Sequence, residues 1–190
     1  MRIAALWAVF ITCVLIPGGT SLAQERTPED PAEKVDELIT EEFPLDDPFY
    51  NERYVRNWAK RMGMAAMSLT FVTYEDTLER SRRNFTKAGY ARFVGGLEDS
   101  GMLQMIEDSQ ISISVAMRGK PKVVDKGVAD GRYRWVIELP IMLYMRNMKT
   151  RVQDFYMLRM LVVRSNELHL PQAIAIDDWV TVPMQDPLAR

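Results

Sequence analysis

The chain has 190 residues, of which 47% are hydrophobic, and its formal net charge at pH 7 is −2. Its only cysteine is Cys13 and its only histidine is His169. These counts exclude an intrachain disulfide, a Cys/His metal site and the usual nucleophile systems built on histidine or cysteine. The length fits one domain with a leader and a tail.

Residues 1–23 have the layout of a secretory signal peptide. One arginine precedes an apolar run, and small residues up to Ala23 precede a polar chain. The run covers residues 3–16, which is 14 residues, whereas about 20 are needed to span a bilayer. We expect export with cleavage after Ala23; the alternative is that the run is retained as a short N-terminal anchor.

Residues 24–50 form an acidic, proline-rich tether. They carry ten acidic and two basic residues, a net charge of −8, while residues 51–190 have a net charge of +5. A short helix is predicted to start at Asp30-Pro31, followed by a narrow apolar stripe. A net charge of +5 over 140 residues is too dilute to predict nucleic-acid binding.

Helices are predicted first in the domain. Apolar residues recur at helical spacing through residues 49–69, after a helix-start signal at Asp47-Pro48. Further helices are predicted over residues 72–84 and 87–100, and one more short helical turn over residues 102–106.

The period then changes to two, which indicates strands. Strands are predicted over residues 111–118 and 122–128, then over 132–146 and 150–164 as a long hairpin, and finally over 173–182. Odd positions of the first hairpin strand are apolar from Tyr133 to Met145, which is typical of one buried face. The second hairpin strand is apolar at odd and even positions alike, so we expect it to be covered on both faces along much of its length. Pro140 is the expected bend.

This order predicts an α+β domain over residues 51–182 with a tail over residues 183–190. Its N-terminal helices should pack on one face of a curved antiparallel sheet.

Few residues suggest catalysis. Asp177 and Asp178 are neighbours on a strand, so their side chains should point to opposite faces and not act as a pair. Asp154 would be a candidate proton-transfer group if its face lined a cavity with a tyrosine, for which Tyr133, Tyr144 and Tyr156 are the candidates. A solvated Asp154 near the hairpin tip is the alternative.

Two surfaces are candidates for protein contact. Arg80, Arg82 and Arg83 form a basic cluster on a predicted helix, and Met148 and Lys149 lie at the hairpin tip. Methionines recur along the hairpin, as they do in cores and in adaptable contact surfaces. The alternative for the arginines is an ordinary solvated helix face.

The order of these pieces resembles the DotI/IcmL family of type IV secretion proteins. The similar stretches are residues 85–103, the run GRYRW at 131–135 with Leu139-Pro140, and the runs LVVR at 161–164 and LPQAIAI at 170–176. The resemblance implies a periplasmic domain of the nuclear-transport-factor-like type, as in VirB-type assembly factors. One departure is that family members carry a membrane anchor after a cytoplasmic tail, where this chain has a short apolar leader.

The same resemblance implies a non-enzymatic building block of a Dot/Icm-like secretion or conjugal transfer complex. It implies no cofactor, other complex subunits and further copies of the chain as partners, and membrane association through partners or an uncleaved leader. The alternative is a periplasmic small-ligand-binding or isomerase-like protein that uses the hollow of the curved sheet. That alternative requires the hollow to be open and not filled by large side chains such as Phe93, Trp135 and Tyr156.

Overall fold

The structure is a computed structural model, and it describes residues 44–167, 170 and 172–185. The leader, the helix predicted at Asp30-Pro31, His169 and the last five residues lie outside the described residues.

Four helices are described, and side-chain caps mark the start of two of them. α2 (Glu52–Met67) begins after Asn51, whose side chain accepts a hydrogen bond from the Tyr54 amide. α3 (Tyr74–Arg82) is followed by α4 (Lys87–Asp99), which Thr86 caps in the same way. α5 (Met102–Ser109) follows Gly101 and is longer than the predicted turn over residues 102–106.

The five strands match the predicted order closely. They are β1 (Ser112–Met117), β2 (Lys122–Ala129), β3 (Arg132–Arg146), β4 (Arg151–Arg164) and β5 (Ile174–Met184). β5 ends two residues later than the predicted last strand, and no described helix start or end departs from its prediction by more than three residues.

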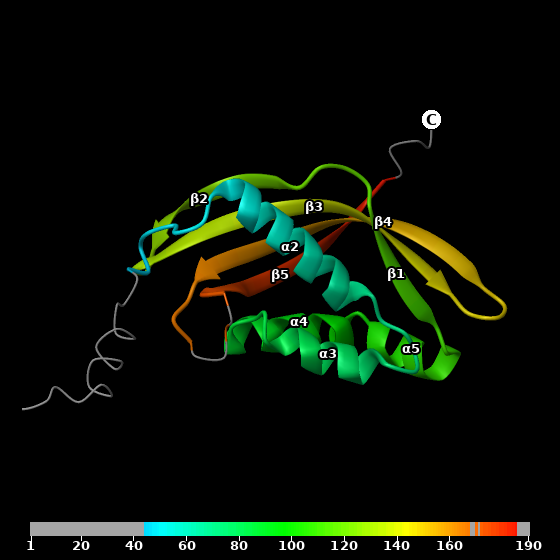
Figure 1. Cartoon of the computed structure of the whole chain (residues 1–190). Helices are drawn as coiled ribbons and strands as arrows, with labels where there is room; N and C mark the ends of the chain where they lie inside the picture. The colour runs from blue at the N-terminus through cyan, green and yellow to red at the C-terminus, as the bar shows by residue number, and fades with distance from the viewer. Residues whose placement is uncertain (1–43, 168–169, 171, 186–190) are drawn as a thin grey trace, which may run out of the picture. The chain divides into compact units, whose positions relative to one another are not determined.

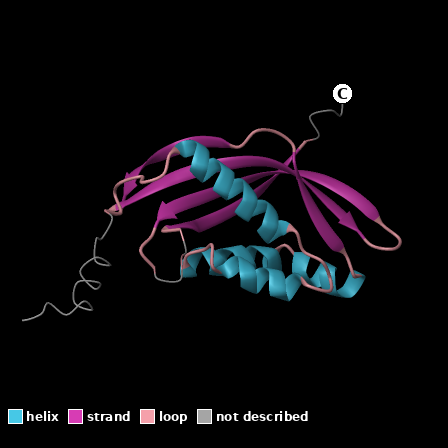
Figure 2. Cartoon of the chain, viewed as in Figure 1, coloured by secondary structure: helices cyan, strands magenta, loops and turns pink. Residues whose placement is uncertain are grey.

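The strands form one antiparallel sheet in the order β1-β3-β4-β5, and β2 pairs with the same edge of β3 as β1 does. The helices all lie on one side of this sheet, which curves over them (Figure 1). The other face carries no helix among the described residues (Figure 2). The predicted α+β class, with helices on a curved antiparallel sheet, is therefore confirmed.

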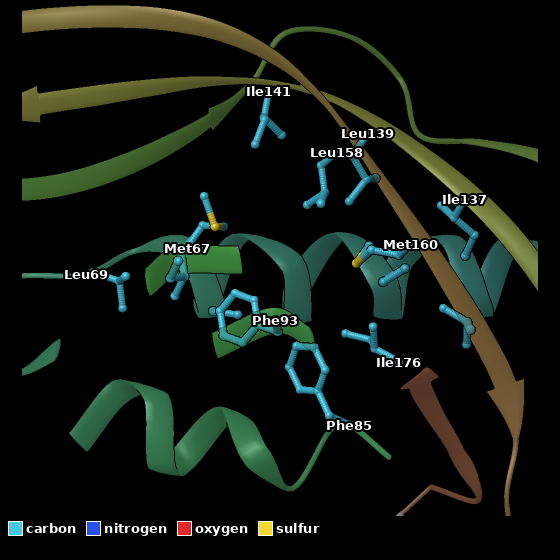
Figure 3. Packing of buried hydrophobic residues seen from close by; sticks show 14 of the residues in the cluster. Met67, Leu69, Phe85, Phe93, Ile137, Leu139, Ile141, Leu158, Met160 and Ile176 are labelled. Atoms are coloured by element: carbon cyan, nitrogen blue, oxygen red, sulfur yellow. The ribbon is translucent and has the colours of Figure 1, made fainter. Parts of the chain in front are cut away.

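The core lies between the helices and β3 and β4. Alternate β3 residues are no more than 1% exposed: Trp135, Ile137, Leu139, Ile141 and Leu143. Figure 3 shows the side chains of the sheet lying opposite those of the helical layer, where Phe85 and Phe93 stack with ring centroids 5.0 Å apart. One face of the hairpin is thus buried, as its alternation predicts.

The prediction for β4 was wrong for its second face. Leu158, Met160 and Val162 are fully buried under the helices, whereas Phe155 and Met157, on the opposite face, are only partly buried. On the outward parity only Val163, 7% exposed, is buried, so cover on both faces is confined to the end of the strand and does not extend along much of its length.

A buried arginine ties the N-terminal arm, residues 44–50, to the sheet. Arg164 is 1% exposed; its Nε donates to the Asp47 carbonyl oxygen at 3.1 Å and its Nη1 to the Ala173 carbonyl oxygen at 2.8 Å. Burial lowers the pKa of its guanidinium from the usual value. The Tyr133 amide also donates to the Leu45 carbonyl oxygen at 2.7 Å, so the arm is held by backbone pairing as well.

α4 meets the backbone of β5 without any side chain between them. A Cβ atom at Gly89 would lie 2.3 Å from the Ile176 carbonyl oxygen. The Thr86 amide donates to that same oxygen at 3.0 Å, and the Ile176 amide donates to the Asn84 carbonyl oxygen at 2.9 Å. Only glycine allows the helix to approach the strand this closely.

Two alanine substitutions in α4 test this contact. We expect Gly89→Ala to lower the free energy of unfolding by about 1–3 kcal/mol, because the new methyl group collides with backbone that cannot move aside alone. Gly95→Ala is the matched control: a Cβ there meets nothing within 4 Å, so helix propensity should raise stability by about 0.5–1 kcal/mol. Urea denaturation measures both, and equal stability of the two variants would contradict the contact.

Candidate interaction site

The basic cluster predicted on α3 is exposed. Arg82 lies 3.7 Å from a Glu79 carboxylate oxygen, and its guanidinium carbon is 5.9 Å from the ring centroid of Tyr90. Arg80 donates to the Thr77 hydroxyl at 3.1 Å, and Arg83 follows at the C-cap. The cluster therefore presents positive charge to solvent, with Arg82 partly neutralised by its acidic neighbour.

The hairpin tip is held by the hydrogen bonds of one side chain. The Asn147 Oδ1 accepts from the amides of Lys149 at 2.9 Å and Thr150 at 2.7 Å, and its Nδ2 donates to the Ser109 carbonyl oxygen at 2.9 Å. The tip is thus fastened to the end of α5. Met148, held in the middle of this turn, has a side chain that is fully exposed, at 101%, so the fold presents a methionine directly to solvent.

A shallow surface pocket of about 750 Å³ adjoins the tip. Its lining includes Phe71, Met148 and Lys149, together with Arg146 and Arg151. These last two arginines stand directly opposite one another across the mouth of the hairpin, an arrangement of like charges that costs stability. The sequence analysis did not identify these arginines as site residues. Their equal distance from the centre of the turn over residues 147–150 could have predicted that they pair.

Asp154 lies on the face of β4 that carries the core, but four residues before Leu158, the first buried residue of that strand. A pocket of about 460 Å³ brings it together with Tyr156, Pro183 and Met184. Burial, and then the charge of Asp154, raise the pKa of the Tyr156 phenol. Of the three candidate tyrosines only Tyr156 shares this pocket, and the aspartate is half-buried at the edge of the sheet.

The expectation that Asp177 and Asp178 point apart was wrong. The pairing of β4 with β5 shifts between Leu161 and Val162, which leaves Asp177 as an extra residue in a β-bulge. Both carboxylates consequently face Arg92 of α4, at 3.5 Å for Asp177 and 3.1 Å for Asp178. The Thr86 hydroxyl donates to Asp177 at 2.6 Å, so the pair fastens α4 to β5.

The described residues provide neither a metal site nor a membrane-spanning helix. No group of three or more His, Cys, Asp or Glu side chains there is placed to hold a metal ion. None of the described helices has both the length and the apolar character that a bilayer crossing needs.

Replacing Asn147 tests whether the tip is held rigidly. We expect Asn147→Ala to speed amide hydrogen exchange at Lys149 and Thr150 by about tenfold, because both amides lose their acceptor. Met148→Ala is the control, since its fully exposed side chain holds no part of the turn, and it should leave those rates within about twofold. Unchanged exchange in Asn147→Ala would show that other contacts hold the turn.

Known proteins are similar to this chain over the same domain. A family model described as a type IVb secretion system inner-membrane complex component, DotI/IcmL, matches residues 31–183. The periplasmic domain of DotI is similar in structure, with a TM-score of 0.69 and 30% identity, covering 71% of this chain and 97% of that one. No curated protein matches the sequence.

Two more distant structures share the fold. A periplasmic fragment of TraM has a TM-score of 0.66 and 18% identity, covering 71% of this chain and 99% of its own. An IcmL-like type IV secretion protein from Legionella pneumophila has a TM-score of 0.65 and 12% identity, covering 73% of this chain and 96% of its own. The nuclear-transport-factor-like description of the fold stays a prediction. The family model and the DotI structure together show that this chain belongs to the DotI/IcmL family of type IV secretion system components.

Proposed function

We propose that this protein is a non-enzymatic structural component of a Dot/Icm-like type IV secretion or conjugal transfer complex, acting in the periplasm through protein–protein contacts. The observation that carries the proposal is its similarity to the DotI periplasmic domain, at 30% identity over 71% of the chain. That similarity covers the part of the chain that folds into the helices and the sheet.

The packing of the core supports a role without catalysis. Phe93 and Trp135, two of the side chains whose placement decides whether the hollow of the sheet is open, are each 1% exposed. They fill the space between the helices and the sheet that an isomerase-like protein would need for a substrate. The ligand-binding alternative therefore depends on the small pocket beside Asp154 and Tyr156, which lies at the edge of the sheet and not in its hollow.

The partners we propose are other subunits of the secretion complex and further copies of this chain, with no cofactor and no nucleic acid. The two candidate contact surfaces are the exposed cluster Arg80, Arg82 and Arg83 on α3, and the hairpin tip with Met148 and Lys149. Neither side-chain set contributes to the buried core. Association with the membrane would then come through these partners or through a retained leader.

Co-isolation tests membership of the complex. An affinity-tagged full chain, produced in cells that carry the secretion system, should co-isolate with the inner-membrane subunits after mild detergent extraction. Deletion of its gene should stop transfer of the secreted substrate. A chain that isolates alone, together with normal transfer in the deletion strain, would refute the proposed function.

Charge reversal tests the α3 surface. We expect R80E/R82E/R83E to reduce co-isolation by about fivefold or more, since exposed charge pairs contribute roughly 0.2–1 kcal/mol each. The matched control R53E/R61E/K87E reverses three exposed charges on α2 and α4 and should change co-isolation by less than about twofold. Equal recovery of the two variants would remove α3 from the contact surface.

The mass of the native chain tests its processing. We expect a mass that starts at Gln24, found in the soluble periplasmic fraction. A full-length mass in the membrane fraction would mean that residues 3–16 are retained as an anchor, and it would contradict cleavage after Ala23.

A further inference from the structure

The face of the sheet that points away from the helices carries an apolar patch. Because side chains alternate along a strand, residues next to the buried ones on β3 and β4 face outward. The register aligns two apolar rows across the strands there: Ala116, Met142, Phe155 and Met184 in one, and Pro140, Met157 and Val182 in the other.

The β5 side of this outer patch is open to solvent, whereas Met142 is only 6% exposed and Phe155 and Met157 are partly buried. Val182 is 49% exposed and Met184 39%, and Tyr144 and Val180 beside the rows are 40% and 46% exposed. Figure 2 shows all the described helices on the opposite side of the sheet. Contiguous apolar surface of this kind, on a sheet that lacks cover, marks a contact site in soluble proteins. The apolar residues of β4 at both parities have the same implication, because a strand of that composition is normally buried on both faces.

The charges around the outer patch are mostly positive. By register, or for Arg118 by its contact with Phe155, seven basic residues of the described chain belong to this face: Arg118, Lys122, Arg132, Arg134, Arg146, Arg151 and Arg159. The same criterion gives the acidic residues Asp125 and Glu138, together with Asp178, whose carboxylate is turned to Arg92 of α4. Glu138 is already engaged with Arg159. The unpaired charge on this face is therefore basic.

This charge pattern favours one kind of occupant. A second copy docked face to face would bring two basic rims together, and like charges disfavour that arrangement. A partner with acidic residues beside an apolar stripe would pair with the basic residues and cover the two apolar rows. The guanidinium carbon of Arg118 lies 5.5 Å from the centroid of the Phe155 ring, so apolar surface and positive charge adjoin within the patch itself.

The size of the rows fits an amphipathic helix. Four strands at spacings of about 4.8 Å make a row of about 14 Å. A helix rises about 1.5 Å per residue, so two to three turns with anchors at i, i+3 or i+4 and i+7 would cover that length. Met184, 39% exposed, and the partly buried Met157 provide side chains that adapt to such a helix.

The edge of β5 does not suggest the other common mode, addition of a strand. The Trp179 amide is held by the Asp178 carboxylate at 2.9 Å, and Pro183 has no amide to donate. Both features blunt a sheet edge against further pairing. The partner is thus expected on the face of the sheet and not at its edge.

We propose that the outer face of the sheet binds an acidic amphipathic helix of a partner subunit, with Phe155, Met157, Val182 and Met184 as the apolar floor and Arg118, Arg146 and Arg151 as the basic rim. This inference rests on the proposed function, because it names the kind of partner that the secretion complex would supply.

Site-specific photocrosslinking in the full chain tests it. A benzoylphenylalanine at Val182 or Tyr144, both on the outer face, should form an adduct in cells that carry the secretion system. Mass spectrometry should place the adduct in a segment of another chain with net negative charge and helically spaced apolar residues. The same group at Val72, a 72% exposed residue of the α2–α3 loop, is the matched control and should not capture that segment.

Charge reversal in the rim then tests the electrostatic part. We expect R118E/R146E/R151E to lower the adduct yield at position 182 by about fivefold or more, and R53E/R61E/K87E on the helical side to change it by less than about twofold. Circular dichroism melting of both triple variants shows whether each is still folded, and V180N/V182N offers a second route that removes apolar area and leaves the charges in place.

Four outcomes would overturn the inference: adducts with the same face of a second copy, with lipid, within a single chain, or in a segment without acidic residues. Failure to form any adduct at positions 182 and 144 would also overturn it. A chain that co-isolates with the inner-membrane complex but gives one of these results refutes the outer-face inference alone. A chain that fails to co-isolate refutes the proposed function as well.

Discussion

Burial of alternate side chains along β3 is the constraint on which the rest of the domain depends. Five residues from Trp135 to Leu143 are almost fully buried at every second position, and β3 is the only described strand that pairs with three others, β1, β2 and β4. A slip of one residue would turn all five to the outer face. The hairpin register therefore also decides which residues the outer face displays, from Arg134 near its start to Arg146 at its end.

Pro140 shows how strictly that register is kept. A proline inside a strand normally removes a ladder hydrogen bond. Its own carbonyl oxygen accepts from the Arg118 amide at 2.8 Å, and the nitrogen of a strand residue points to the same side as its oxygen. The proline nitrogen thus faces the gap between β1 and β2, where no donor is needed. A Cβ at Gly119 would lie 2.8 Å from the Pro140 ring, so the gap is closed by a glycine.

Residue periodicity was sufficient to predict the elements of the fold but not all of its side-chain directions. The alternation from Tyr133 to Met145 predicted the buried face of β3 because strand geometry leaves no other reading. The bulge at Asp177 has no comparable local signal: it depends on how β5 meets both β4 and Arg92 of α4. Likewise, the position of Arg146 beside the tip pocket depends on its pairing with Arg151. That pairing follows only when the turn over residues 147–150 is known.

The uncovered side of β4 connects the core to the proposed function. Composition alone led to an expectation of cover on both faces along much of β4, whereas on the outward face only Val163 is buried. Phe155 and Met157 are only partly buried, and exposed apolar surface raises the risk of aggregation. Phe93 and Trp135 are buried between the helices and the sheet, and for Phe155 and Met157 we propose a role in contact with a partner. The basic rim adds charge repulsion to the folded domain, and the acidic partner that we propose would offset that unfavourable energy.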